Sequence, residues 1–164
     1  MTSGKPVTGP RRPDNCGECG TSFPWVGVPV KGKSDDIWDR LHPKVVKVAR
    51  KRYEDGHFAD AVEASLKLLN QTVKKIVIDR TGQEYDGAPL MRNAFSPKNP
   101  IIILGDLGSE SGRNIQQGYM EIFAGAMTGI RNPKAHEVMT IDDKRAIHHL
   151  FLTSLLFSKL DESQ

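Results

Sequence analysis

Four segments of this chain repeat apolar residues at intervals of three or four, and this spacing constrains the fold more than any other feature. Such an interval gathers apolar side chains on one face of an α-helix, whereas a half-buried strand would alternate them. We expect helices at about residues 34–56 (restarting at Pro43), 58–79, 110–128 and 141–160. The sequence therefore predicts an all-α bundle.

Residues 81–108 connect the second and third predicted helices and are rich in glycine and proline. Within this connection the sequence predicts one helical turn at Leu90–Phe95. Ile101–Leu104 is predicted as a short buried strand or a clamp on the core. Connections of this length usually pack on the core or carry function.

The first 33 residues differ in composition from the rest and are predicted to form an irregular arm, with one short strand at Val26–Val30. They hold five of the ten prolines, and five basic residues against two acidic ones. Residues 34–164 hold 18 basic and 18 acidic residues, so the basic excess belongs to the arm. The arm is interpreted as a solubilising tail or as a segment that touches phosphate. The helical domain is expected to span 34–164.

The composition is that of an ordinary globular protein, with 38% hydrophobic and 26% charged residues. No apolar run is long enough to span a membrane, and the N-terminus lacks the apolar core of a secretory signal. The chain is therefore expected in the cytoplasm, with no membrane partner.

Cys16 and Cys19 are the only cysteines, and they stand at the Cys-x-x-Cys spacing of half a zinc site. Zinc usually takes four ligands, and no second such pair follows. A complete site would need distant histidines or a second subunit, which leaves a zinc-dependent adaptor as an open alternative. The simpler interpretation is an irregular turn.

Arg131, Asn132 and His136 follow the third predicted helix in the stretch GIRNPKAHE. Because Pro133 disfavours the α region for the residue before it, Asn132 is expected to leave the helix and bring His136 back toward Arg131. The Arg-x(4–6)-His spacing is a weak pattern alone, since Arg50 and Arg52 both match it with His57. Those three residues are interpreted as the end of one helix and the start of the next.

The tract resembles the Arg-x(4–6)-His motif of the HEPN superfamily (higher eukaryotes and prokaryotes nucleotide-binding), and within it the phage- and prophage-associated Ymh-type family. The matching stretches cover about residues 36–160 and are Leu41–Val45, Gly56–Ala64, Leu90–Ser96 and Gly129–His136. The resemblance implies a four- to five-helix bundle that forms a homodimer with the two motifs facing each other. It also implies either a metal-independent endoribonuclease of a toxin or phage-conflict system, or a non-catalytic module that binds nucleotide, RNA or a partner protein.

For the enzyme, the resemblance implies Arg131, Asn132 and His136 as catalytic residues. An imidazole can move protons near neutral pH, and a guanidinium can hold phosphate oxygens. Lys134 would attract substrate, or would simply be a solvated lysine. No cofactor and no metal ion is expected. His148 and His149, adjacent in the last predicted helix, are interpreted as surface or interface residues.

Overall fold

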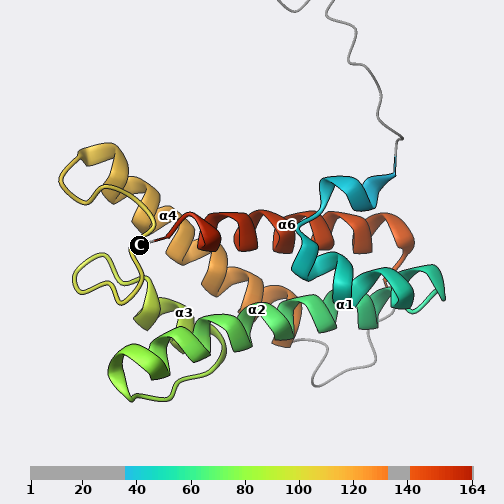
Figure 1. Ribbon diagram of the computed structural model, residues 1–164, viewed down its shortest axis with the longest axis horizontal. Coiled ribbons are helices and arrows are strands. Elements are labelled where there is room, and N and C mark those ends of the chain that lie inside the picture. The colour runs from blue at the N-terminus through green and yellow to red at the C-terminus, as the bar shows by residue number, and fades with distance from the viewer. Residues whose placement is uncertain (1–35, 133–140, 164) are drawn as a thin grey trace, which may run out of the picture. The chain divides into compact units, whose positions relative to one another are not determined.

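The computed structural model describes residues 36–132 and 141–163. Its longest helix, α2 (Phe58–Thr81), is the hub of the bundle, contacting α1 (Pro43–Glu54), α3 (Gly87–Ala94), α6 (Asp143–Asp161) and the π-helical η2 (Met127–Arg131). Its buried stripe includes Val62, Leu66, Leu69, Val73 and Val77. Gly82 ends the helix with φ 69°, in the left-handed region that glycine adopts without strain. Figure 1 shows α2 in green along one side of the bundle and α6 in red along the other.

The predicted restart at Pro43 is present. A short 3₁₀ helix, η1 (Ile37–Arg40), begins at Asp36, whose side chain accepts a hydrogen bond from the Trp38 N–H. α1 then begins with Pro43 in its first turn, where the missing N–H costs nothing. His42 caps α1, because its Nδ1 accepts a hydrogen bond from the Lys44 N–H at 3.2 Å.

The long connection contains α3, a full two-turn helix where one turn was predicted. The expected strand alternative at Ile101–Leu104 is wrong, because this segment is irregular and only clamps the core. The N–H groups of Ile101 and Ile102 both donate to the Ala94 carbonyl, at 3.0 and 2.9 Å. No neighbouring strand offers the segment a ladder within the described residues.

Gln116 of α4 (Glu110–Ala126) fixes the same clamp from inside the bundle. Its side chain is fully buried, accepts from the Leu104 N–H at 2.7 Å and donates to the carbonyls of Phe95 and Ile102 at 3.0 Å. The spacing of apolar residues in this helix therefore does not by itself identify its buried face. Gln116 is buried with Phe123 and Met127, whereas Ile115 and Ile122 are 37% and 41% exposed.

The C-terminal helix α6 begins at Asp142, whose side chain accepts from the Arg145 N–H at 2.7 Å. Its buried residues include Leu150, Leu156, Phe157 and Leu160, and they pack against α1 and α2. The prediction of an all-α bundle is confirmed. Across the two described stretches, no helix combines the length and apolar character needed to cross a bilayer.

Candidate functional site

Arg131, the first predicted catalytic residue, lies at the end of η2 and faces the start of α3. Its Nη1 and Nη2 donate to Asp86 Oδ2 at 3.3 and 3.4 Å. The arginine side chain is 21% exposed and the aspartate side chain 56% exposed. Arg131 is thus a half-buried cation in a loose ion pair, and within residues 36–132 and 141–163 its other guanidinium N–H groups have no hydrogen-bond partner and could bind an anion.

Asn70 holds Asp86 from behind. This α2 side chain is 2% exposed, and its Nδ2 donates to Asp86 Oδ1 at 2.5 Å. Its Oδ1 accepts from the Gly87 N–H at 3.0 Å. Gly87 has φ 59°, in the left-handed region that glycine adopts without strain, so the turn favours glycine, while a Cβ there would only be in ordinary contact with Arg131 Nη1 at 3.6 Å. We call Asn70, Asp86, Gly87 and Arg131 the Arg131 corner.

The charges of this corner favour an ionised Asp86. Burial acts to raise the pKa of its carboxyl, but the hydrogen bonds from Asn70 and Arg131 and the charge of Arg131 outweigh burial and lower the pKa below its ordinary value. Nearby, Lys74 and Glu84 form an ion pair at 2.6 Å. Arg131 in the corner and Lys74 near it are therefore each already accompanied by a carboxylate.

Asn132 is exposed and helical, with φ −68° and ψ −41°. The prediction that Pro133 would keep it out of the α region is wrong. The reason is local, because the Asn132 N–H donates to the Met127 carbonyl five residues back and closes a π-helical turn. Lys134, His136, Cys16 and Cys19 lie outside the described residues, as does the predicted strand at Val26–Val30.

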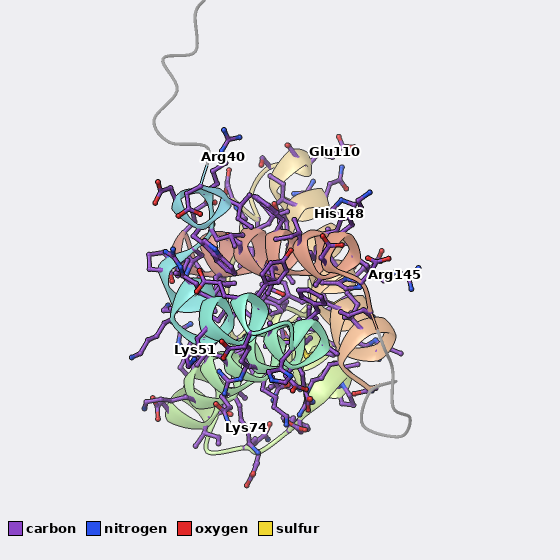
Figure 2. All side chains as sticks on the ribbon, turned by 90° about the vertical axis from the view of Figure 1, so that its right-hand side faces the viewer. Arg40, Lys51, Lys74, Glu110, Arg145 and His148 are labelled. Atoms are coloured by element: carbon purple, nitrogen blue, oxygen red, sulfur yellow. The ribbon has the colours of Figure 1, made fainter. Side chains whose placement is uncertain are left out.

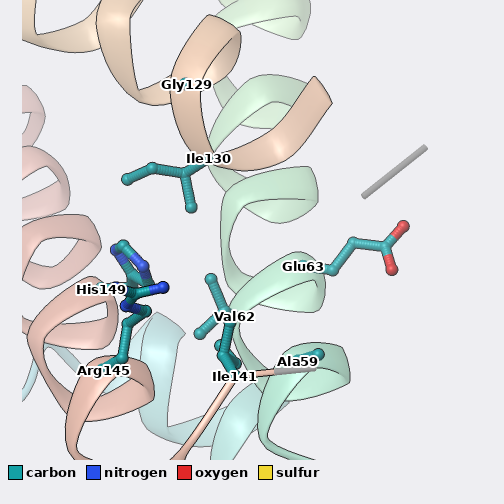
Figure 3. A pocket seen from close by; sticks show the side chains of 8 residues that line it. All are labelled: Ala59, Val62, Glu63, Gly129, Ile130, Ile141, Arg145 and His149. Carbon is teal, nitrogen blue, oxygen red and sulfur yellow. The ribbon is translucent and has the colours of Figure 1, made fainter. Parts of the chain in front are cut away.

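A pocket of about 340 Å³ lies beside the corner, between the N-terminal half of α2, η2 and the start of α6. Figure 3 shows Arg145 and His149 of α6 together on one side and Val62 of α2 across from them. Burial, followed by the charges of Arg145 and His148, lowers the pKa of His149. The sequence interpretation of His149 as a surface or interface residue missed this pocket, although its spacing of four from Arg145 places both on one helix face.

The other predicted motif with this spacing, Arg52 and His57, forms no site. Arg52 Nη1 donates to the Val48 carbonyl, and His57 is exposed and makes no side-chain cap for α2. Basic residues of α1 form ion pairs with acidic neighbours. Arg50 pairs with Glu54 at 2.8 Å and Lys51 pairs with Asp55 at 2.9 Å.

Fold and site together define an all-helical protein in which the end of η2, the start of α3 and the middle of α2 meet at a paired arginine. The family model described as "Protein of unknown function (Hypoth_ymh)" matches residues 39–160, so the chain belongs to this family. The Ymh-type resemblance is thereby confirmed. No curated protein and no solved structure matches the chain.

Proposed function

We propose that this protein is a metal-independent endoribonuclease of the HEPN type, acting in phage–host conflict or as a toxin. The observation that carries the proposal is the placement of Arg131. A guanidinium held half-buried at a helix end, with donors that no other described residue accepts from, is suited to bind a phosphate. The adjoining π-helical turn supports it, since such turns are frequent at functional sites.

In the proposed reaction the ribose 2′-OH attacks the adjacent phosphorus, and a new P–O bond forms. His136 of one subunit takes the hydroxyl proton, and His136 of the second subunit gives a proton to the departing 5′ oxygen. Arg131 stabilises the charge on the phosphorane, with Asn132 orienting the imidazole or bonding to phosphate. The products are a 2′,3′-cyclic phosphate and a 5′-hydroxyl, and Lys134 attracts the RNA.

The homodimer in this proposal needs apolar surface to bury. Ile115 and Ile122 on α4 and Leu155 on α6 are 37%, 41% and 49% exposed. Large apolar side chains at this exposure are what a subunit contact would cover. The dimer brings the two motifs into one cleft, which is why a single subunit would be inactive.

The test is cleavage of mixed RNAs in EDTA by the wild type, Arg131→Ala and His136→Ala. We expect loss of at least about a hundredfold in both variants, with 2′,3′-cyclic ends in the wild type. Arg52→Ala and His57→Ala are matched controls, because this pair has the same spacing but both residues are exposed on other elements. Equal loss in the control pair would refute the assignment.

A second function, a non-catalytic module that binds nucleotide, RNA or a partner protein, is favoured by two observations. Asp86 already neutralises much of the charge on Arg131, and residues 34–164 carry no net charge. This alternative predicts no cleavage by a folded dimer, together with binding of RNA or nucleotide that Arg131→Ala removes. Filter binding and sedimentation measure the two properties on the same samples.

A further inference from the structure

The pocket beside the Arg131 corner has features of a ligand site of its own. It is lined by Ala59, Val62, Glu63, Gly129, Ile130, Ile141, Arg145 and His149, and its volume of about 340 Å³ is that of a small-molecule site. Arg131 follows Ile130 directly in the chain but bonds to Asp86 on α3. The two sites are therefore neighbours with different lining residues.

The two charged side chains of the pocket, Arg145 and Glu63, differ in whether they are paired. The Arg145 side chain makes no hydrogen bond or ion pair with residues 36–132 or 141–163, and Figure 2 shows it reaching out at the surface near His148. Glu63 is paired with Lys67 at 2.7 Å, and Figure 3 shows its carboxylate turned away from Arg145 and His149. Within these described residues the pocket thus holds a cation with no ion-pair partner, and Glu63, its one lining carboxylate, is already paired.

His149 adds a second polar group with a definite charge state. Its lowered pKa keeps the imidazole neutral at neutral pH, so the ring offers one donor and one acceptor. The ring makes no hydrogen bond within the described parts of the chain. Opposite it, Val62, Ile130 and Ile141 provide apolar surface.

We propose that this pocket binds a small amphiphilic anion, with a compact apolar body against Val62, Ile130 and Ile141 and one phosphate or carboxylate group on Arg145 and His149. An apolar lining with a few convergent polar groups is the usual composition of such sites. A guanidinium is the side chain best shaped for either oxyanion. Binding in this pocket does not require that the protein cleaves RNA.

The experiment is an NMR titration of the full-length chain labelled at its isoleucine methyl groups. The probes are phenyl phosphate and phenylacetate, with benzyl alcohol lacking the charge and inorganic phosphate lacking the apolar body. We expect the methyls of Ile130 and Ile141 to shift with at least one aromatic anion and the exposed Ile78 methyl to stay unchanged. If phenyl phosphate binds more tightly, the ligand carries a phosphate; if phenylacetate binds more tightly, it carries a carboxylate.

Two matched pairs of variants test the location. A Cβ at Gly129 or at Gly125 meets nothing within 4 Å, but only Gly129 lines the pocket. Gly129→Met should therefore abolish binding and Gly125→Met should leave it unchanged. Arg145→Gln should weaken binding of the anions about tenfold, whereas Lys144→Gln, the same loss of charge on an exposed neighbour, should have little effect.

Three results would each overturn the proposal. One is that neither aromatic anion shifts Ile130 or Ile141 up to its solubility limit. Another is that benzyl alcohol binds as tightly as phenyl phosphate and phenylacetate, which would remove the role of Arg145. The third is that Gly129→Met and Arg145→Gln, with wild-type circular dichroism, bind like the wild type.

Discussion

Two polar corners of this bundle use similar side chains in opposite ways. At one, which we call the His42 corner, the His42 ring stacks on Phe157 with centroids 5.2 Å apart, and its Nε2 contacts Asp161 Oδ2 at 2.8 Å. The His42 backbone N–H donates to Ser154 Oγ at 2.7 Å. At the Arg131 corner the ion pair to Asp86 is longer, at 3.3 and 3.4 Å.

The difference separates a structural device from a candidate site. Every polar atom of the His42 ring is used, because Nδ1 accepts from the Lys44 N–H and Nε2 is left to donate to Asp161. Its side chain is 10% exposed. Arg131 combines a loose pair with donors that are unused within the described part of the chain, and it stands beside a half-exposed carboxylate. The His42 corner connects α1 to α6. At the Arg131 corner, the guanidinium could exchange Asp86 for an anionic ligand.

Among the variants proposed here, the loss of the Asn70 side chain, which supports the Arg131 corner, should lower the free energy of unfolding the most. Asn70→Ala leaves the Gly87 N–H and the inner oxygen of Asp86 without their partner in a buried place, and we expect a loss of about 2–3 kcal/mol in the free energy of unfolding. Urea unfolding measures it. The neighbouring Gln71→Ala, at an exposed position, should cost at most about 0.5 kcal/mol.

Equal losses at Asn70 and Gln71 would mean that the Arg131 corner is not organised by a buried network. The Arg131 corner would then lack the buried support that distinguishes it from the His42 corner.

At the His42 corner we expect a smaller loss, because part of the network is exposed. His42→Ala should lower the free energy of unfolding by about 1–2 kcal/mol through the lost cap, the stacking on Phe157 and the contact with Asp161. His57→Ala is the matched control, since His57 also precedes a helix but makes no side-chain cap. Thermal unfolding of both variants gives the difference, and an equal shift in the two would contradict a structural role specific to His42.

Much of the fold could be predicted from local signals. The repeat of apolar residues and the glycine at position 82 placed α2 within two residues of its observed end, Thr81. Local sequence patterns failed where contacts distant in the sequence determine the backbone conformation. Ile101–Leu104 has the composition of a strand, but its N–H groups find the Ala94 carbonyl and the Gln116 side chain, and no sequence pattern announces those partners.

The candidate site could be predicted only in part for the same reason. Arg131 is visible in its motif, but its partner Asp86 lies 45 residues earlier in the chain. Asn70 offered a weak signal, a polar side chain next to Leu69 on a largely apolar stripe that also includes Ser65. That Arg145 has no ion-pair partner among the described residues depends on where Glu63 points, which only the packed helices determine.

Asp86→Asn tests whether the carboxylate positions Arg131 or competes with its ligand. Removing a negative charge beside the guanidinium should tighten RNA binding about threefold, while the loss of the ion pair should slow cleavage about tenfold by loosening the arginine. Filter binding and single-turnover cleavage report the two effects separately. Glu84→Gln, a carboxylate paired with Lys74 instead, is the control. Cleavage that rises together with binding would show that Asp86 only competes.

The smallest effect is expected at the His42 corner in acid. The hydrogen bond from His42, followed by that from Lys44, lowers the pKa of the Asp161 carboxyl. A lowered folded pKa adds stability that is complete above the unfolded value of about 3.9 and is lost as pH falls through the folded pKa. Because the Asp161 side chain is 50% exposed, water screens the pair, and we expect only a few tenths of a kcal/mol.

Urea unfolding of the wild type and Asp161→Asn between about pH 3 and pH 6 measures this contribution. The wild type should be the more stable at the upper end, and the gap should close toward the lower end because protonated Asp161 no longer accepts from both partners. Lys44→Gln removes one of the two donors and should lose part of the same acid-dependent gap. A gap that stays constant across this range would mean that the charge of Asp161 contributes nothing, so the His42 corner would be held by the stacking on Phe157 and by the cap alone.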